Sequence, residues 1–341
     1  MHNNSSKMLF MLFIIMGSMI SLSSYSWMGI WMGLEINMLS FIPMLSKQNN
    51  MLMNETSIKY FIVQTLASST LMMSIILIHM KSMMNLMMYD MMTLMINLSL
   101  MMKIGAAPMH YWLTEVMGET NWMNCLMLMT WQKLTPLAVM SYCIKMNMII
   151  MTIVMMSAII GSLGGLNQSS LRKMLAYSSI NHMGWMIMTM MISENLWEIY
   201  FIVYSMMSIM VIMMMNQNKL IWMNQMFNSN NDNNLNKYLI YLSMLSLGGL
   251  PPFTGFIPKW LTMQMMIENN MTFIMTVLIM SSMITLYYYL RITFTAMILT
   301  SEINKWNIKN NQSTKMNMTM SMMVIMSNTM MLMSPNIIFI L

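Results

Sequence analysis

Charged residues are scarce in this sequence. Only 8% of its 341 residues are charged, whereas about 25% is usual in soluble globular proteins. Hydrophobic residues make up 57% of the chain, and the mean hydropathy is +0.59. This balance excludes an ordinary soluble domain and predicts an all-α polytopic membrane protein.

Cysteine and the common cofactor motifs are also scarce or absent. The two cysteines, Cys125 and Cys143, lie in one apolar stretch, and along a helix they would be about 27 Å apart, beyond disulfide reach. The sequence has no CxxC, CxxCH or Cys/His cluster for an iron–sulfur or haem centre. It also has no GxGxxG motif and no Walker A loop. We therefore expect no cofactor and no metal in this chain.

Methionine is abundant instead, with 66 residues spread along every segment. Metal binding through thioethers is one interpretation of this excess. The even spread favours packing, because methionine is a flexible apolar gap-filler. Translation of an AT-rich mitochondrial genome, with a code that reads an isoleucine codon as methionine, accounts for the number.

Apolar stretches of about 17–25 residues indicate membrane-spanning helices. We count eleven, with short connections except for the asparagine-rich segments 217–236 and 300–318. The start, MHNNSSK, resembles neither a transit peptide nor a signal peptide, so we expect the first span to be retained. The expected spans are 8–24, 26–45, 59–80, 89–111, 122–144, 148–166, 173–191, 196–216, 237–264, 271–299 and 319–341.

The basic residues orient this bundle. Ten lie on the side of the N-terminus, whereas only Lys81 and Lys145 lie on the other side. Positive residues gather on the cytoplasmic or matrix side of membranes, so we expect the N-terminus there. The ten are Lys7, Lys47, Lys59, Arg172, Lys173, Lys219, Lys237, Lys305, Lys309 and Lys315.

Two spans contain helix breakers at matching places. Gly105 to Pro108 interrupt the fourth span, and Gly248, Gly249, Pro251 and Pro252 interrupt the ninth. The ninth span comes five spans after the fourth, an odd number, so the two broken helices would run in opposite directions. Such pairs indicate inverted repeats that surround a transport site. We expect one transmembrane domain, 1–341, with repeats at 8–144 and 148–299 and a C-terminal helix at 319–341.

Four ionisable residues lie deep in apolar spans: Glu35, Lys103, Lys133 and Lys259. A charge at bilayer depth costs roughly 2.5–3.5 kcal/mol or more, so such residues usually mark an ion or proton path. The alternative for Glu35 is packing alone, and for Lys259 it is an interfacial lysine that reaches toward water. Arg291, near the end of its span, has the same alternative.

His182 lies in the seventh span beside Ser178, Ser179 and Asn181. Histidine titrates near neutrality and could relay protons, or it could be a structural residue bonded to those neighbours. For His110 and Asp90 we favour an interfacial role over an entry point for protons. We expect three consecutive tyrosines to pack or anchor their span rather than to bind a ligand: Tyr287, Tyr288 and Tyr289.

Five segments together identify a resemblance. The sequence resembles the subunit 2 family of mitochondrial NADH:ubiquinone oxidoreductase, respiratory complex I, in its insect-like form, over residues 1 to about 300. The segments are WMGLEINMLSFIPML, KIGAAPMHYW, LMTWQKLTPL, GGLNQSSLRKMLAYSSINHMGW and LSLGGLPPFTGFIPKWL.

The resemblance implies an antiporter-like fold with inverted five-helix repeats and a role for each buried ionisable residue. Glu35 would be the glutamate of a glutamate–lysine pair, with Lys103 as its partner on the broken helix. Lys133 would be the bridging lysine, and His182 would stand on the central axis where relatives carry lysine. Lys259 would be the lysine on the second broken helix.

The resemblance also implies partners and location. The chain would translocate protons as a membrane subunit of NADH:ubiquinone reductase, in the inner mitochondrial membrane, with its N-terminus in the matrix and its C-terminus in the intermembrane space. NADH, FMN, iron–sulfur clusters and ubiquinone would be bound elsewhere in the complex. We expect contacts with other membrane-arm subunits and with lipids such as cardiolipin, and none with nucleic acid. The alternatives are a stand-alone sodium/proton antiporter and a structural scaffold.

Overall fold

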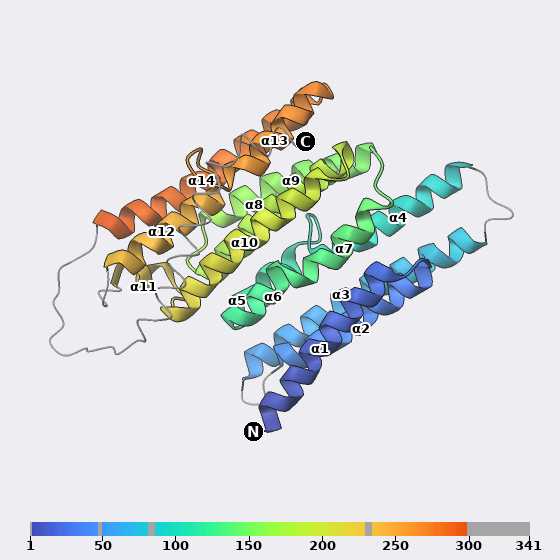
Figure 1. The fold of residues 1–341 in the computed structure, drawn as a ribbon, viewed down its shortest axis with the longest axis horizontal. Helices are drawn as coiled ribbons and strands as arrows, with labels where there is room; N and C mark the ends of the chain where they lie inside the picture. Colours follow the sequence, from blue (N-terminus) through green and yellow to red (C-terminus); the bar gives the residue numbers. More distant parts are fainter. Residues whose placement is uncertain (1, 47–49, 81–85, 229–233, 299–341) are drawn as a thin grey trace. The chain divides into compact units, whose positions relative to one another are not determined.

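A computed structural model describes residues 2–46, 50–80, 86–228 and 234–298, and Figure 1 shows their helices. Within these ranges the chain is helical, apart from one isolated antiparallel bridge between Ser170 and Trp222. It divides into two compact units, Met1–Asn147 and Met148–Leu341. The expected helix at 319–341 and the segment 300–318 lie outside the described residues.

The first unit contains seven helices in its described part; α4 and the turn after it occupy the expected fourth span, 89–111, and α5 begins at its last residue. They are α1 (His2–Ser23), α2 (Trp27–Leu45), α3 (Met51–His79), α4 (Leu86–Ile104), α5 (Tyr111–Glu119), α6 (Trp122–Met129) and α7 (Trp131–Ser141).

The second unit contains a further seven helices in its described part, and α12 and α13 are the halves of the expected ninth span. They are α8 (Met148–Leu166), α9 (Leu171–Ile192), α10 (Leu196–Gln217), α11 (Met223–Asn228), α12 (Asn234–Gly248), α13 (Phe256–Glu268) and α14 (Thr272–Ile298).

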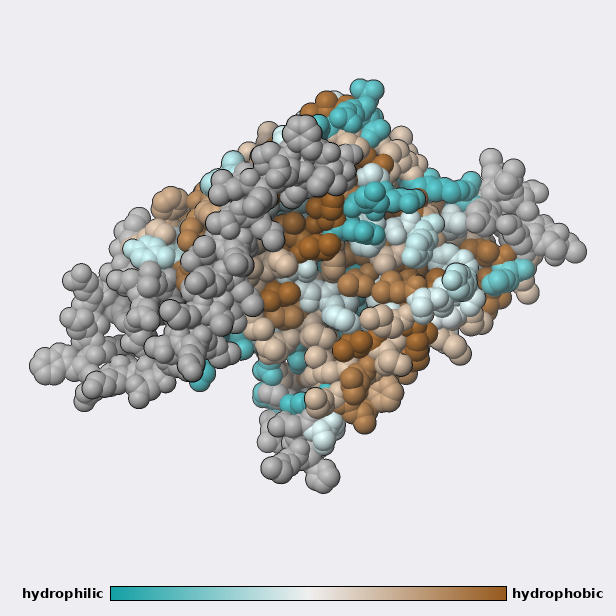
Figure 2. Space-filling view, viewed as in Figure 1, coloured by the Kyte–Doolittle hydropathy of each residue, from teal (hydrophilic) through white to brown (hydrophobic). Residues whose placement is uncertain are grey.

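Six described helices are long and apolar enough to cross a membrane: α1, α2, α3, α8, α10 and α14. Many of their large apolar side chains are exposed, among them Leu12, Phe61 and Ile202. Apolar residues accordingly cover much of the visible surface in Figure 2. Such a surface suits lipid rather than water.

The structure differs from the expected spans in several places, and α3 begins at Met51 rather than at the expected 59. The stretch 122–144 is not one helix, because it breaks at Thr130 into α6 and α7. The helix after the first break continues to Glu119, beyond the expected end at 111. The segment 217–236, expected as a loop, contains the short helix α11.

Glycines let the first two helices of each unit approach backbone to backbone. A methyl group added at Gly17 in α1 would lie 2.8 Å from the Asn37 backbone nitrogen in α2. In the second unit, a methyl group at Gly161 in α8 would lie 2.5 Å from the Asn181 backbone nitrogen in α9. Small residues at helix contacts give this close packing in membrane proteins. Each asparagine is therefore held on a tightly packed pair of helices.

Candidate functional site

The first helix break is a local consequence of glycine. Gly105 has a φ of +81°, a conformation that glycine adopts without the steric cost of a Cβ. Its nitrogen donates to Met102 O, and the Ala106 nitrogen donates to Met101 O, which is the Schellman pattern of a helix end. Pro108 follows and prevents the helix from resuming at once.

Neutral side chains satisfy the carbonyls that this break leaves open. Trp112 Nε1 donates to Met102 O at 3.1 Å, and Gln64 Nε2 donates to Lys103 O at 3.2 Å. The Lys103 side chain is 7% exposed, so it is buried directly before the break. The broken helix thus presents a lysine inside the protein, with its backbone fixed by α3 and α5.

Lys103 and Lys133 line the same small cavity of the first unit. Lys133 in α7 is 1% exposed, the most deeply buried of the lysines in the described ranges. The cavity therefore brings together two lysines that lie on different spans. The other lining residues are Leu34, Asn37, Met38, Tyr60, Gln64, Ile104, Trp112, Leu128, Gln132, Thr135 and Pro136.

Glu35 of α2 lies within electrostatic range of Lys103 and of Tyr60. Its Oε2 atom is buried and has no hydrogen-bond partner among the described residues. Glu35 and Lys103 do not form a direct ion pair within 4.0 Å in these described parts of the chain. The carboxylate and the ammonium group are near each other but not in contact.

Sequence reasoning missed the amides of this cavity. Gln132 Nε2 donates to Asn37 Oδ1 at 2.9 Å and so joins α7 to α2. Gln64 lies in the middle of α3, where it is 5% exposed. Uncharged amides are uncommon in apolar spans and need hydrogen-bond partners there, which is the signal that could have identified them.

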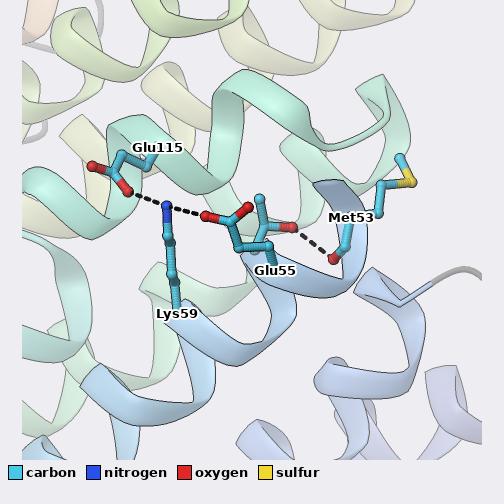
Figure 3. A network of polar contacts seen from close by, with 5 residues as sticks. Met53, Glu55, Lys59 and Glu115 are labelled. Carbon is cyan, nitrogen blue, oxygen red and sulfur yellow. Dashed lines mark hydrogen bonds and ion pairs between the residues drawn. The ribbon is translucent and has the colours of Figure 1, made fainter. Parts of the chain in front are cut away.

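Ion pairs lie toward the two ends of the first unit. Lys59 Nζ of α3 contacts Glu55 at 2.9 Å and Glu115 of α5 at 2.8 Å (Figure 3). Lys145 Nζ contacts Asp90, near the start of α4, at 3.1 Å. The carboxylate of Glu115 thus fixes α5, the half of the broken helix beyond Gly105, to α3.

The second break repeats the first in detail. Gly249 has a φ of +83°, its nitrogen donates to Ser246 O, and the Leu250 nitrogen donates to Leu245 O. Here a lysine satisfies an open carbonyl, because Lys259 Nζ of α13 donates to Gly248 O at 2.9 Å. Lys259 is 4% exposed, so its side chain turns inward, and the interpretation of an interfacial lysine is wrong.

His182 lines a second small cavity, which lies within the second unit. Its Nδ1 atom lies 3.0 Å from the Tyr200 hydroxyl of α10. Ser178 and Ser179 donate their hydroxyl hydrogens to carbonyls of their own helix, at Leu175 and Ala176. The structure therefore provides a tyrosine partner that the sequence did not suggest.

The cavity at His182 reaches the second broken helix. Beyond its histidine and tyrosines, the wall contains Leu247 at the end of α12 and Gly255 and Pro258 around the start of α13. Lys259 follows Pro258 directly. The histidine and the second broken helix thus share one wall, just as Lys103 and its break do in the first unit.

Equivalent features of the two units are separated by a constant 144 residues. The spacing relates Gly105 to Gly249, Pro108 to Pro252, and the close contacts of Gly17 with Asn37 to those of Gly161 with Asn181. It also relates two cavity tyrosines, Tyr60 and Tyr204.

The remaining predicted residues have structural roles. Tyr288 and Tyr289 are 0% and 1% exposed, which confirms that they pack their helix, while Tyr287 is 58% exposed. Arg291 Nη2 donates to Leu166 O at the end of α8, at 2.8 Å. His110 is 2% exposed within the turn after α4, and its Nδ1 atom lies 3.1 Å from Pro108 O. Within the described ranges, no three His, Cys, Asp or Glu side chains gather as a possible metal site.

Comparison with known protein families first identifies the class of protein to which this chain belongs. The family described as "NADH:quinone oxidoreductase/Mrp antiporter, TM" matches residues 24–285. The chain belongs to this family of multi-pass membrane proteins. Its curated relatives include "NADH-ubiquinone oxidoreductase chain 2" of Locusta migratoria, 51% identical over 306 residues that cover 90% of each chain. The protein of the same name from Anopheles gambiae is 46% identical over 313 residues, covering 91% of this chain and 92% of that one.

Solved structures share the fold at low identity. One chain of respiratory complex I from Thermus thermophilus has a TM-score of 0.84 at 19% identity, covering 95% of this chain and 77% of that one. A chain of the Mrp complex from Dietzia sp. has a TM-score of 0.81 at 14% identity, with 96% and 75% covered. These likenesses confirm the predicted antiporter-like, mostly helical fold.

Proposed function

We propose that this chain is a proton-translocating, antiporter-like core subunit of respiratory complex I in the inner mitochondrial membrane. As part of NADH:ubiquinone reductase it would couple electron transfer to proton pumping. The observation that carries the proposal is the cavity of the first unit, where Lys103 and Lys133 are buried beside a broken helix and near Glu35.

The chemistry of the cavity suits proton transfer. Burial favours the neutral form of a lysine, whereas a nearby carboxylate favours the charged form. A change in the distance between Glu35 and Lys103 would therefore switch the lysine between holding and releasing its proton. Lys133, on the same cavity, would accept that proton, and His182 and Lys259 would continue the path in the second unit.

The constant spacing of 144 residues supports an internal repeat. The Schellman ends at Gly105 and Gly249 and the contacts at Asn37 and Asn181 all follow it. The two compact units meet at Asn147 and Met148, where the expected repeats also meet. We propose that the repeats, 8–144 and 148–299, are inverted in the membrane, as matching broken helices in transporters are.

The partners follow from the same proposal. The relatives carry the name of an NADH-ubiquinone oxidoreductase chain, so we place NADH, FMN, iron–sulfur clusters and ubiquinone in other subunits. The exposed apolar helices would contact membrane-arm neighbours and lipids such as cardiolipin. The basic asymmetry of the sequence places the N-terminus in the matrix and the C-terminus in the intermembrane space.

Lys133→Met, in the complete complex, tests the function. Positioned proton-transfer groups contribute about a hundredfold or more to a rate, so NADH-driven acidification should fall at least about tenfold. Lys145→Met is the matched control, because Lys145 is exposed and pairs with Asp90 outside the cavity. Normal pumping by an assembled Lys133→Met complex would favour the scaffold alternative. Sodium-for-proton exchange by the isolated chain in liposomes would favour the stand-alone antiporter.

A further inference from the structure

The hydrogen bond between Gln132 and Asn37 lies at the start of α7, the helix of Lys133, where the backbone hydrogen bonding of this helix is incomplete. Helix α7 begins after the break at Thr130, where φ is −113° and ψ is −75°. Pro136, inside α7, has no N–H to donate to the carbonyl of Gln132, four residues earlier. Lys133 therefore lies between the helix break at Thr130 and the missing backbone hydrogen bond at Pro136.

Asn37, in contrast, lies on a firmly packed element. Its backbone nitrogen is at the closest approach of α1 and α2, because a methyl group at Gly17 would lie only 2.8 Å away. Its side chain is 3% exposed. The bond from Gln132 Nε2 to Asn37 Oδ1, 2.9 Å long, thus fixes the start of α7 to a rigid partner.

Both amides also line the cavity that holds Lys103 and Lys133. Asn37 lies two residues after Glu35 in α2, and Gln132 directly precedes Lys133 in α7. The bond therefore joins the helix of the carboxylate to the helix of the second lysine. A neutral amide pair makes this connection without adding another charge to a buried site, where charge is costly.

We propose that Asn37 and Gln132 are positioning residues for Lys133. Their hydrogen bond holds Lys133 at the distance from Glu35 and Lys103 that proton transfer in the first unit requires. This inference rests on the function proposed above. The amides do not carry the proton themselves. Loss of their bond lets the start of α7 shift, so that Lys133 spends less time in the transfer geometry.

The second unit contains a weaker contact at the equivalent position. Asn181, 144 residues after Asn37, has Ser281 Oγ of α14 at 3.4 Å from its Oδ1 atom, but the single hydroxyl hydrogen of Ser281 has a closer acceptor in Leu278 O, at 2.8 Å. In each unit a polar side chain from a helix after the broken pair approaches this asparagine position, but only Gln132 makes a short hydrogen bond to it. In the second unit, moreover, the approaching side chain is not adjacent to a lysine. Of the two residues that approach this asparagine position, only Gln132 is therefore suited to position a lysine, because it directly precedes Lys133.

The test is a set of variants of the complete complex, with acidification measured per assembled complex. Gln132→Met keeps the size of the side chain but removes the bond. We expect about fivefold slower NADH-driven acidification, the change in population that corresponds to one lost buried hydrogen bond. The exchanged variant, Asn37→Gln with Gln132→Asn, keeps an amide pair of the same total length and should restore most of the rate.

Asn124→Leu is the matched control. Asn124 Nδ2 of α6 donates to Met44 O of α2 at 2.9 Å, so its bond has the same length and joins neighbouring helices outside the cavity. Acidification per assembled complex should be unchanged in this variant. An equal loss of rate in Asn124→Leu would mean general loosening and would overturn the positioning role.

The other outcomes separate the two proposals. Normal acidification in Gln132→Met, while Lys133→Met is slow, would overturn the positioning role and leave the proposed function in place. Normal acidification in both variants would overturn the function itself. Failure of both Gln132→Met and the exchanged variant to assemble would show that the amides serve assembly, which would also overturn the proposal.

Discussion

Lys259 Nζ donates a hydrogen bond to the carbonyl oxygen of Gly248 at 2.9 Å. Gly248 is the last residue of α12, and Lys259 lies in α13, so the lysine spans the break in its own helix. The open carbonyls at a helix C-terminus carry partial negative charge, which favours a cation there. The break and the buried lysine therefore stabilise each other.

Lys259→Met should reduce proton pumping and, where pumping and electron transfer are tightly coupled, NADH oxidation as well. The change removes a proton carrier and leaves the Gly248 carbonyl without its donor. NADH-driven acidification in a fully assembled complex measures the effect. The exposed Lys145, changed to methionine, controls for the loss of a positive charge. Normal acidification in Lys259→Met would assign this lysine to helix packing alone.

Glu35 and Lys103 should act as a coupled pair. Each is costly alone at membrane depth, so removal of one partner strands a buried charge or leaves an unused proton site. Glu35→Gln and Lys103→Met should therefore each impair pumping and assembly more than the double variant does. A double-mutant cycle on pumping rate and assembly provides the measurement. Strictly additive effects would mean that the two residues do not interact.

Gly255 and Gly248 should differ sharply in their tolerance of a methyl group. A Cβ at Gly255 would overlap the backbone carbonyl of Ser246, and backbone cannot move aside as a flexible side chain can. At Gly248 the nearest atom to an added Cβ is Tyr289 Cδ2, at an ordinary contact distance of 3.4 Å. Gly255→Ala should thus prevent assembly, while Gly248→Ala should assemble normally, as judged on native gels. Equal assembly of the two variants would contradict the packing of the second break.

The N-terminus should lie in the matrix, because ten basic residues gather on that side and only two on the other. The segment 300–318 contains three of the ten, Lys305, Lys309 and Lys315, and should be protected from protease added outside intact mitoplasts. Its cleavage after the membrane is opened serves as the positive control. Cleavage from the outer face of intact mitoplasts would reverse the orientation.

Local chemistry explains what the sequence predicted well. Gly105 and Pro108, like Gly249 and Pro252, end a helix through backbone preferences that belong to the residues themselves. Both breaks, and the lysines near them, were therefore expected before the structure was known. The burial of Lys103, Lys133 and Lys259 follows equally directly from the apolar runs that surround them.

Contacts between distant helices explain what the sequence did not predict. The break at Thr130 lies in LMLMTWQKL, which has neither glycine nor proline, so no local helix breaker at that position predicted it. The donor to Asn37 comes from 95 residues further along the chain, and the partner of His182 lies on the next helix. Side-chain partners at such separations depend on how the helices pack, which hydrophobic patterning leaves open.

The correspondence between the two units has a mechanical consequence. Position 103 is lysine, and its counterpart 247 is leucine; position 38 is methionine, and its counterpart 182 is histidine. In the first unit one of the two lysines of the cavity, Lys103, thus lies on the broken helix α4, whereas in the second the histidine of the cavity lies on the unbroken helix α9. A movement of the broken helix would carry the proton carrier along in one cavity. In the other, it would reshape the wall around a carrier that stays in place.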